Sequence, residues 1–217
     1  MVASSTSPIS PGGSVDAEGI WRSIRPGAAE AGRGRPALFL DRDGVVNVDH
    51  GYVHRLDDLD MIPGAAELIA AANRRGLPVV IVTNQSGVGR GYFGWAEFTA
   101  FQSEIERRLL AAGAWIDAAF ACPFHADAAA PHDVPDHPCR KPNPGMIHAA
   151  ATVFASELAA SWIVGDRPGD MLAGDRAGLA GGVLIGAEAP GRLRDTFDLR
   201  IADDTVTAAQ LVPLIAD

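Results

Sequence analysis

The chain has 217 residues, of which 47% are hydrophobic and 21% charged, a composition typical of one globular domain with a full core. Its net charge of −9 argues against a general nucleic-acid or anionic-membrane surface, although it allows a locally basic pocket for an anionic substrate. No apolar run approaches the ~20 residues that cross a bilayer, and the N-terminus lacks a basic and apolar leader. We therefore expect a cytoplasmic monomer that binds neither nucleic acid nor membrane.

Residues 1–35 are rich in Ser, Pro, Gly and Ala and show little periodicity. This composition predicts a flexible N-terminal extension, followed by a single domain over residues 36–217. One apolar patch, Ile20 to Ile24, interrupts the extension. It could dock on the body of the protein or on a partner, but a single apolar patch in a tail is usually incidental.

From Ala37 onward, short apolar runs alternate with segments of helical periodicity. Buried strands are predicted at residues 37–40, 77–84, 118–122, 162–166, 182–185 and 199–202, and helices at residues 63–75, 95–112, 144–154, 168–177 and from about 206. This alternation implies right-handed crossovers and a three-layer α/β fold with a Rossmann-like parallel sheet. The glycine-rich segment at residues 87–91 lies too far past its strand to serve as the G-x-G-x-x-G turn of a dinucleotide site.

Two carboxylates follow the first predicted strand. Asp41 falls at its carboxyl end, and Asp43, two residues on, can face the same side, while Gly44 lets the backbone turn away. A carboxylate can take a phosphoryl group as nucleophile, and a neighbouring acid can protonate the departing alcohol and then deprotonate water. We assign these roles to Asp41 and Asp43, although an isolated D-x-D-G is more often a turn.

Two later segments can bind the phosphate itself. The strand at residues 77–84 ends in a polar run whose hydroxyl and backbone N–H groups suit phosphate oxygens. The loop at residues 140–145 is stiffened by two prolines, so Lys141 can act as a point charge and Arg140 can offer a planar fork to a second anionic group. The candidate phosphate-binding residues of the first segment are Thr83, Asn84, Gln85 and Ser86.

The fourth predicted strand ends in another carboxylate, Asp166. Mg²⁺ prefers oxygen ligands and keeps several waters, so a sparse set of Asp41, the Asp43 carbonyl and Asp166 suits it. Asp170 is expected behind these ligands as a supporting carboxylate. A lone Gly-Asp after a strand could instead be a helix cap and nothing more.

Taken together, the motifs D-x-D-G, T-N, R-K-P and G-D-x-x-x-D resemble the haloacid dehalogenase superfamily of aspartyl-phosphate phosphatases, over roughly residues 37–190. Residues 41–54, 83–87, 139–146 and 164–166 look more specifically like the D-glycero-D-manno-heptose 1,7-bisphosphate 7-phosphatase family, which makes a heptose precursor of cell-surface polysaccharide. This resemblance implies a small phosphorylated sugar as substrate and Mg²⁺ as cofactor.

The resemblance also implies roles for single residues. Asp41 would be the nucleophile, Asp43 the acid/base and Asp166 a magnesium ligand. Thr83 and Lys141 would steady the transferred phosphoryl group, and two arginines would contact the substrate. The substrate-binding residues that it adds are Asp49, His50, Gly51, Tyr52, Arg140 and Arg167.

Three alternative functions differ from this one in features that the sequence shows. Histidinol-phosphate phosphatases share the four motifs but typically not the segment from Asp49 to Tyr52. Phosphomutases of the superfamily usually insert a helical cap after the first motif, whereas the segment between Gly44 and Pro63 has room only for a loop, so we expect no cap domain. A non-catalytic sugar-phosphate sensor would need neither a nucleophile nor an acid/base.

These families also carry a zinc loop of the form Cys-x-His followed by Cys-x-Cys. Here Phe124 stands at the usual His position and His137 at that of a Cys. Two readings stay open: a structural Zn²⁺ on two cysteines and two histidines, with His132 as a substitute ligand, or a metal-free loop packed around Phe124. The four candidate zinc ligands are Cys122, His125, His137 and Cys139.

Overall fold

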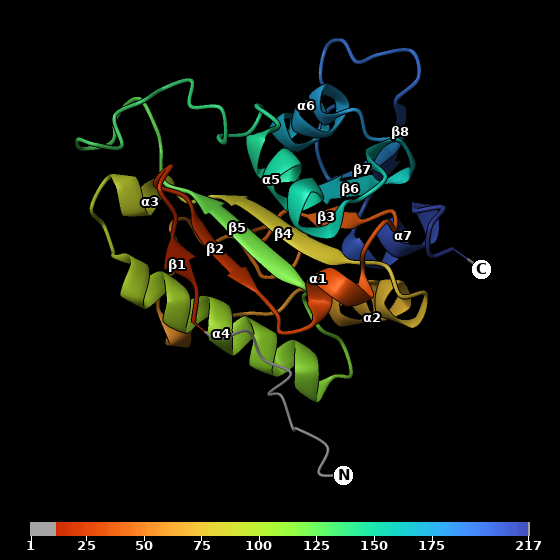
Figure 1. Ribbon diagram of the computed structural model, residues 1–217, viewed down its shortest axis with the longest axis horizontal. Coiled ribbons are helices and arrows are strands. Elements are labelled where there is room, and N and C mark those ends of the chain that lie inside the picture. Colours follow the sequence, from red (N-terminus) through yellow and green to blue (C-terminus); the bar gives the residue numbers. More distant parts are fainter. Residues whose placement is uncertain (1–11, 217) are drawn as a thin grey trace.

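One eight-stranded sheet runs through the computed structural model, which describes residues 12–216 (Figure 1). The strands lie in the order β1-β2-β5-β4-β3-β6-β7-β8, and the six from β5 to β8 are parallel. Their bounds are β3 (Leu38–Leu40), β4 (Val79–Asn84), β5 (Ala118–Cys122), β6 (Trp162–Gly165), β7 (Gly181–Ile185) and β8 (Asp198–Ala202). The predicted parallel strands are confirmed, and each begins and ends within two residues of its expected position.

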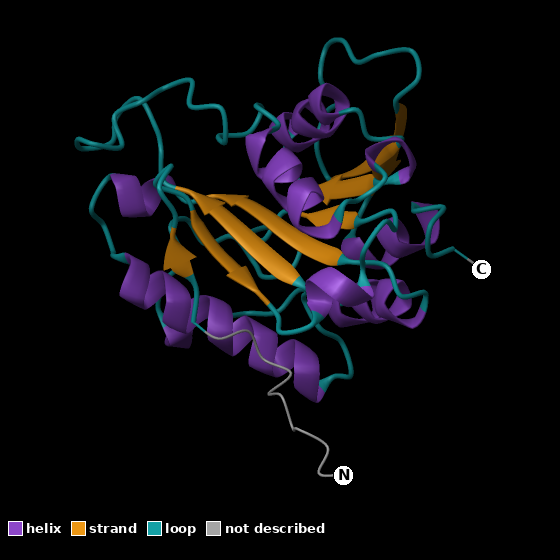
Figure 2. Cartoon of the chain, viewed as in Figure 1, coloured by secondary structure: helices purple, strands orange, loops and turns teal. Residues whose placement is uncertain are grey.

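Helices cover both faces of the sheet, as Figure 2 shows, so the predicted three-layer α/β fold is confirmed. Leu68 of α2, Phe101 of α4 and Ala208 of α7 belong to one hydrophobic core, and Ile147 and Phe154 of α5 belong to a second core, which also includes residues of α1 and α6. The helices are α1 (Ala28–Ala31), α2 (Ala65–Arg74), α3 (Ser86–Gly89), α4 (Trp95–Ala111), α5 (Gly145–Phe154), α6 (Pro168–Ala177) and α7 (Thr205–Leu211), with short 3₁₀ turns η1 (Leu56–Asp58) and η2 (Leu158–Ala160).

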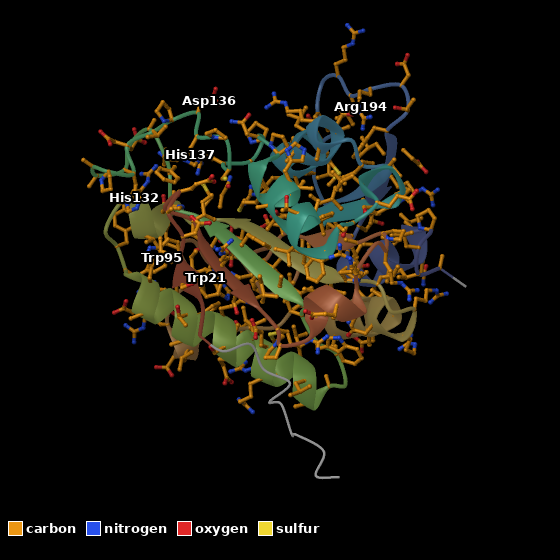
Figure 3. The ribbon with its side chains drawn as sticks, in the orientation of Figure 1. Trp21, Trp95, His132, Asp136, His137 and Arg194 are labelled. Atoms are coloured by element: carbon orange, nitrogen blue, oxygen red, sulfur yellow. The ribbon has the colours of Figure 1, made fainter. Side chains whose placement is uncertain are left out.

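The segment before β3 differs from the expected flexible extension. β2 (Trp21–Ile24) pairs antiparallel with β5, and β1 (Ser14–Val15) pairs with β2. Trp21 is buried with its ring 4.9 Å from Phe98 of α4, and its Nε1 donates to Thr99 Oγ1 at 3.0 Å (Figure 3). The apolar patch therefore docks on the body of the protein, where it covers the edge of β5. Of the predicted extension, residues 1–11 lie outside the described part of the chain.

No cap domain follows β3. Residues 45–64 make a short excursion held by isolated bridges from Asn47 to Asp43 and to Met61, together with η1. The carboxyl ends of β3, β4 and β6 are consequently left accessible from one side. In residues 12–216, no helix has the length and apolar character needed to cross a membrane.

Candidate active site

Asp41 lies at the tip of the central strand β3. Its backbone N–H donates to the Val164 carbonyl of β6 at 2.9 Å, which holds it between the two strands. Its Oδ1 accepts the Arg42 backbone N–H at 2.7 Å and lies 3.0 Å from Lys141 Nζ. Burial raises the pKa of Asp41 to about 7, Lys141 opposes that shift, and Asp170 adds to it. The proposed nucleophile is therefore buried beside one cation.

That cation, Lys141, is the only lysine in the chain. Its Nζ lies 2.6 Å from Asp170 Oδ1 as well as near Asp41, and its side chain is buried. Burial disfavours the ammonium, but Asp170 and Asp41 together outweigh it, so the pKa of Lys141 is raised. The Asn84 side chain fixes the loop, because its amide donates to the Lys141 carbonyl at 3.0 Å and accepts the Lys141 N–H at 3.1 Å.

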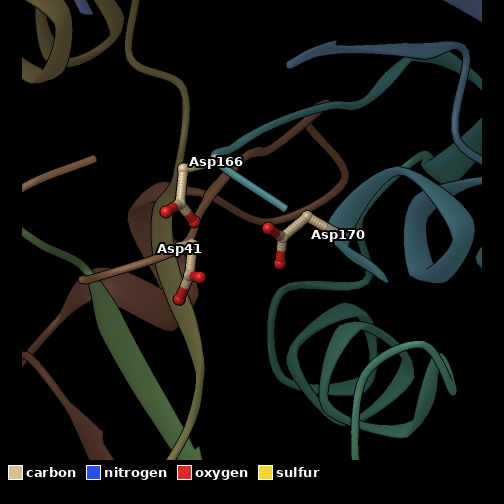
Figure 4. Close-up of side chains that lie close together, drawn as sticks. All are labelled: Asp41, Asp166 and Asp170. Atoms are coloured by element: carbon tan, nitrogen blue, oxygen red, sulfur yellow. The ribbon is translucent and has the colours of Figure 1, made fainter. Parts of the chain in front are cut away.

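Three carboxylates face one another in this site, as Figure 4 shows. One oxygen from each of Asp41, Asp166 and Asp170 lies within 4.8 Å of the other two, and within residues 12–216 this is the one such group of three His, Cys, Asp or Glu ligand atoms. Burial, followed by the nearby Asp170, raises the pKa of Asp166 to about 6. Asp166 Oδ1 is buried without a hydrogen-bond partner. An all-oxygen set with an unsatisfied buried acceptor fits Mg²⁺.

Asp170 lies closer to the centre than we expected from the sequence. Its Oδ2 accepts the Arg167 N–H at 3.0 Å, which caps α6, while its Oδ1 faces Lys141. Gly44 makes room for the cluster: it has φ +88°, and a Cβ at this position would lie 2.3 Å from Asp166 Oδ2.

We expect the affinity for Mg²⁺ to rise with pH. Below about 7 and 6, respectively, Asp41 and Asp166 bind protons in the metal-free protein, and the metal must displace them. The dissociation constant should therefore fall roughly tenfold or more between pH 6 and 8 and level off above that range. Calorimetric titration in buffers of different ionisation enthalpy measures both the affinity and the protons released. A constant affinity without proton release across this range would contradict the raised pKa values.

Asp43 accepts hydrogen bonds from three side chains. Arg42 contacts both of its oxygens, Asn47 Nδ2 donates to Oδ1 at 2.9 Å, and Gln85 Nε2 donates to Oδ2 at 2.8 Å. Gln85 Nε2 also lies 3.0 Å from Thr83 Oγ1, so it links the end of β4 to the first motif. Neither Arg42 nor Asn47 was predicted to be a site residue. An Arg between two aspartates is typical of a solvated side chain, so the sequence did not indicate that Arg42 is buried.

A cavity of about 360 Å³ opens above these groups. Of the residues that we predicted to bind substrate, it is lined by Asp49, Gly51, Tyr52, Thr83, Asn84, Gln85, Ser86, Lys141 and Arg167. His50 and Arg140 are not in its lining within the described chain: His50 Nε2 lies 3.0 Å from Asp60, and Arg140 Nη1 donates to the Phe124 carbonyl at 2.9 Å. The cavity thus joins the phosphate-binding motifs to the loop expected over the sugar.

The four candidate zinc ligands do not converge. His137 stacks on Phe124 with ring centroids 3.6 Å apart, and its Nδ1 accepts the Cys139 N–H at 3.2 Å. His125 faces Arg90, and burial raises the pKa of Cys122 to about 11 and of Cys139 to about 12. His132 lies edge-on to Phe124. The structure therefore does not support a zinc site, and the observed loop agrees with the metal-free interpretation, in which the loop packs around Phe124.

We expect protein purified without chelator to contain less than about a tenth of an equivalent of zinc, because within residues 12–216 no three of these ligands bring their atoms within 4.8 Å of one another. Chelation should leave the melting temperature unchanged. Elemental analysis and a thermal scan check this. One equivalent of zinc in the wild type, lost in the double variant Cys122→Ser, Cys139→Ser, would contradict the prediction and support a structural zinc site.

Comparison with known proteins places this site in a family. A family profile described as "HAD-hyrolase-like" matches residues 138–208. D-glycero-beta-D-manno-heptose-1,7-bisphosphate 7-phosphatase from Mesorhizobium japonicum is 48% identical over 171 residues, which cover 76% of this chain and 79% of that protein. The protein of the same name from Escherichia coli K12 is 38% identical over 150 residues, with 69% and 78% covered.

Solved structures agree. A HAD-like protein from Mesorhizobium loti superposes with a TM-score of 0.81 at 40% identity and covers 96% of this chain and 95% of its own. D,D-heptose 1.7-bisphosphate phosphatase from B. bronchiseptica, complexed with magnesium and phosphate, gives 0.69 at 32% identity, with 81% and 97% covered. Since sequence and fold agree over most of both chains, this protein belongs to the D-glycero-beta-D-manno-heptose-1,7-bisphosphate 7-phosphatase family.

Proposed function

We propose that the chain is a magnesium-dependent phosphatase that removes the 7-phosphate of D-glycero-D-manno-heptose 1,7-bisphosphate, a step toward a cell-surface polysaccharide precursor. The observation that carries the proposal is the placement of Asp41 at the tip of β3, buried beside Lys141 and open to a cavity whose other wall contains Asp49 and Tyr52. The names of the relatives supply the substrate class.

The chemistry takes two displacements. An oxygen of Asp41 attacks the 7-phosphorus, the bond from phosphorus to the sugar oxygen breaks, and Asp43 gives its proton to the departing alkoxide. Asp43 then takes a proton from water, whose oxygen attacks the same phosphorus and releases inorganic phosphate and the Asp41 carboxylate. Lys141 offsets negative charge on the phosphoryl oxygens.

Magnesium fits the cluster of Asp41, Asp166 and Asp170 and, when bound there, would neutralise negative charge on the phosphate oxygens. The Asp43 carbonyl stays part of this proposed ligand set. In the metal-free protein, Lys141 offsets the charge of Asp41 and Asp170, and Arg167 lies 3.3 Å from Asp166.

Recognition of the remote 1-phosphate is proposed for the two arginines near the cavity. Arg167 lies at the rim, 3.2 Å from Asp49 and 3.3 Å from Asp166. Arg140 directly precedes Lys141 and is anchored through the Phe124 carbonyl. A guanidinium fork suits a phosphate, and binding energy gained there can position the reacting phosphate.

The test is release of phosphate, with Mg²⁺ present, from heptose 1,7-bisphosphate, heptose 7-phosphate and histidinol phosphate. We expect the highest kcat/KM on the bisphosphate. Arg167→Ala and Arg140→Ala should each lower that value roughly 10- to 100-fold, as expected for a lost charged hydrogen bond, and lower the value for the 7-phosphate much less.

Arg22→Ala provides the control. Arg22 is an exposed arginine on β2, so its loss should change kcat/KM for neither substrate. A higher kcat/KM on histidinol phosphate would overturn the proposed substrate. Equal losses on both heptose phosphates would remove the arginines from recognition of the 1-phosphate.

A further inference from the structure

Arg42, the residue between the two catalytic aspartates, has a fully buried side chain. Its guanidinium carbon lies 5.0 Å from the ring centroids of both Phe98 and Phe101 on α4. A buried cation is costly unless it is paired, and the two rings leave it little freedom to turn. Its partner therefore shows what this arginine does.

The partner is the proposed acid/base. Arg42 Nε lies 3.0 Å from Asp43 Oδ1, and Arg42 Nη2 lies 2.9 Å from Oδ1 and 3.0 Å from Oδ2. Both carboxylate oxygens are thus held by one rigid, planar group, which fixes the plane of the carboxylate as well as its position. Asn47 and Gln85 add one neutral donor to each oxygen.

The same guanidinium contacts the loop over the cavity. Arg42 Nη2 lies 3.4 Å from the Val53 carbonyl, directly after Tyr52, which lines the cavity. The Arg42 backbone N–H donates to Asp41 Oδ1 at 2.7 Å. Arg42 therefore joins the acid/base, the nucleophile and the edge of the sugar loop, although its own side chain is shut off from the cavity.

We propose that Arg42 is a positioning residue for proton transfer: its guanidinium, clamped between Phe98 and Phe101, aims the Asp43 carboxylate at the sugar oxygen that leaves and at the water that follows. This inference rests on the proposed phosphatase function. Proton transfer requires hydrogen-bond geometry, and a small misplacement is enough to lose most of its contribution. A lysine would keep the charge but not the fork.

The experiment compares Arg42→Lys, Asp43→Asn and the double variant, each with Mg²⁺, on heptose 1,7-bisphosphate and on 4-nitrophenyl phosphate. For the sugar phosphate, Arg42→Lys should lower kcat/KM about 10²-fold, at the low end of what general acid catalysis contributes. For 4-nitrophenyl phosphate the change should stay within about threefold, because nitrophenolate departs without a proton. Phosphoenzyme should accumulate with this substrate, because the misplaced Asp43 carboxylate is a poor base for the attacking water.

The double variant shows whether Arg42 acts through Asp43. If it does, adding Arg42→Lys to Asp43→Asn costs no further activity on the sugar phosphate beyond about threefold, because coupled residues are not additive. If Arg42 were merely structural, Arg42→Lys would lower kcat/KM equally for both substrates, and in the double variant the two losses would multiply. That result would overturn the proposal.

Arg25→Lys is the matched control. Arg25 pairs with the buried Asp117, which directly precedes β5 and accepts the N–H of Val79 at the start of β4, so this pair lies at the opposite end of the strands from the site. Arg25→Lys therefore reports the cost of replacing a paired guanidinium without touching proton transfer. If Arg42→Lys does not fold, Phe101→Leu serves instead, because it removes one of the two rings and keeps the ion pair. It should lower kcat/KM for the sugar phosphate roughly three- to tenfold more than for 4-nitrophenyl phosphate. Full activity of Phe101→Leu on both substrates would then reject the clamp. Wild-type protein inactive on every phosphate would instead refute the phosphatase function.

Discussion

Asp41→Asn is expected to lower kcat by roughly 10⁵-fold or more, the order of loss seen when a nucleophile is removed. An amide cannot attack phosphorus, and it is a poorer magnesium ligand than a carboxylate. Steady-state phosphate release measures the turnover, and trapping with radiolabelled substrate should find no phosphoenzyme.

The same substitution should not destabilise the metal-free protein. The pKa of Asp41 is raised to about 7, so the folded state favours the protonated form, and its contribution to stability is lost as the pH rises through 7. At pH 8, without Mg²⁺, a neutral Asn removes that cost, and the melting temperature should be unchanged or higher.

Asp175→Asn is the matched control, since Asp175 is equally buried but pairs with Arg194 away from the cavity. It should lose stability and keep activity. Near-normal turnover of Asp41→Asn would show that Asp41 is not the nucleophile.

Lys141→Met is expected to impair both catalysis and folding. Lys141 is the one cation that lies within 3.0 Å of both Asp41 and Asp170 in the described chain, and removing one partner of a buried ion pair costs about 3–5 kcal/mol. Activity should fall by on the order of 10³-fold, because the phosphoryl group loses a charge held in a desolvated site.

The loss of stability should depend on pH. The raised pKa keeps Lys141 charged throughout pH 5 to 8, so the dependence comes from the carboxylates. At pH 5, Asp41 and Asp166 are largely protonated in the wild type and gain little from the ammonium. At pH 8 they are ionised in the wild type, and the variant loses the Lys141 charge that stabilises this ionised form. Urea unfolding of the metal-free variant should therefore show a larger deficit at pH 8 than at pH 5.

Lys141→Arg controls for charge, and it should recover more stability than activity because a planar fork does not replace a point charge. An equal deficit at both pH values would mean that Lys141 does not offset these carboxylates.

Local patterns predicted the parallel sheet well. Short apolar runs followed by helical periodicity located all six parallel strands. Burial on both faces makes β3 to β7 apolar over most of their length, whereas the edge strand β8 is partly exposed and includes Asp198 and Arg200. The N-terminal segment escaped that reasoning: β2 has one buried face and lies within a stretch rich in Gly and Pro, so nothing near it in sequence indicates pairing with β5.

The site residues follow the same division. Asp41 and Asp166 were predicted to meet because the carboxyl ends of neighbouring parallel strands lie at one edge of a sheet, and the structure brings them together. Arg140 was predicted to bind the substrate; one of its nitrogens donates to the Phe124 carbonyl, and it is not among the described residues that line the cavity, so its role stays a prediction. The zinc ligands were predicted from ligand type and spacing, which cannot show that the His137 ring stacks on Phe124.

The sequence by itself determined the alternation of strands and helices and the polar residues at each strand end, because backbone geometry and side-chain periodicity are local. Only the tertiary structure decided the strand order, the edge formed by β2, the contact of Lys141 with Asp41, and the burial of Arg42 between two phenylalanines of α4. Each of these depends on packing between segments far apart in the chain, such as the 57 residues from Asn84 to Lys141, and no local pattern records which side chains that packing brings together.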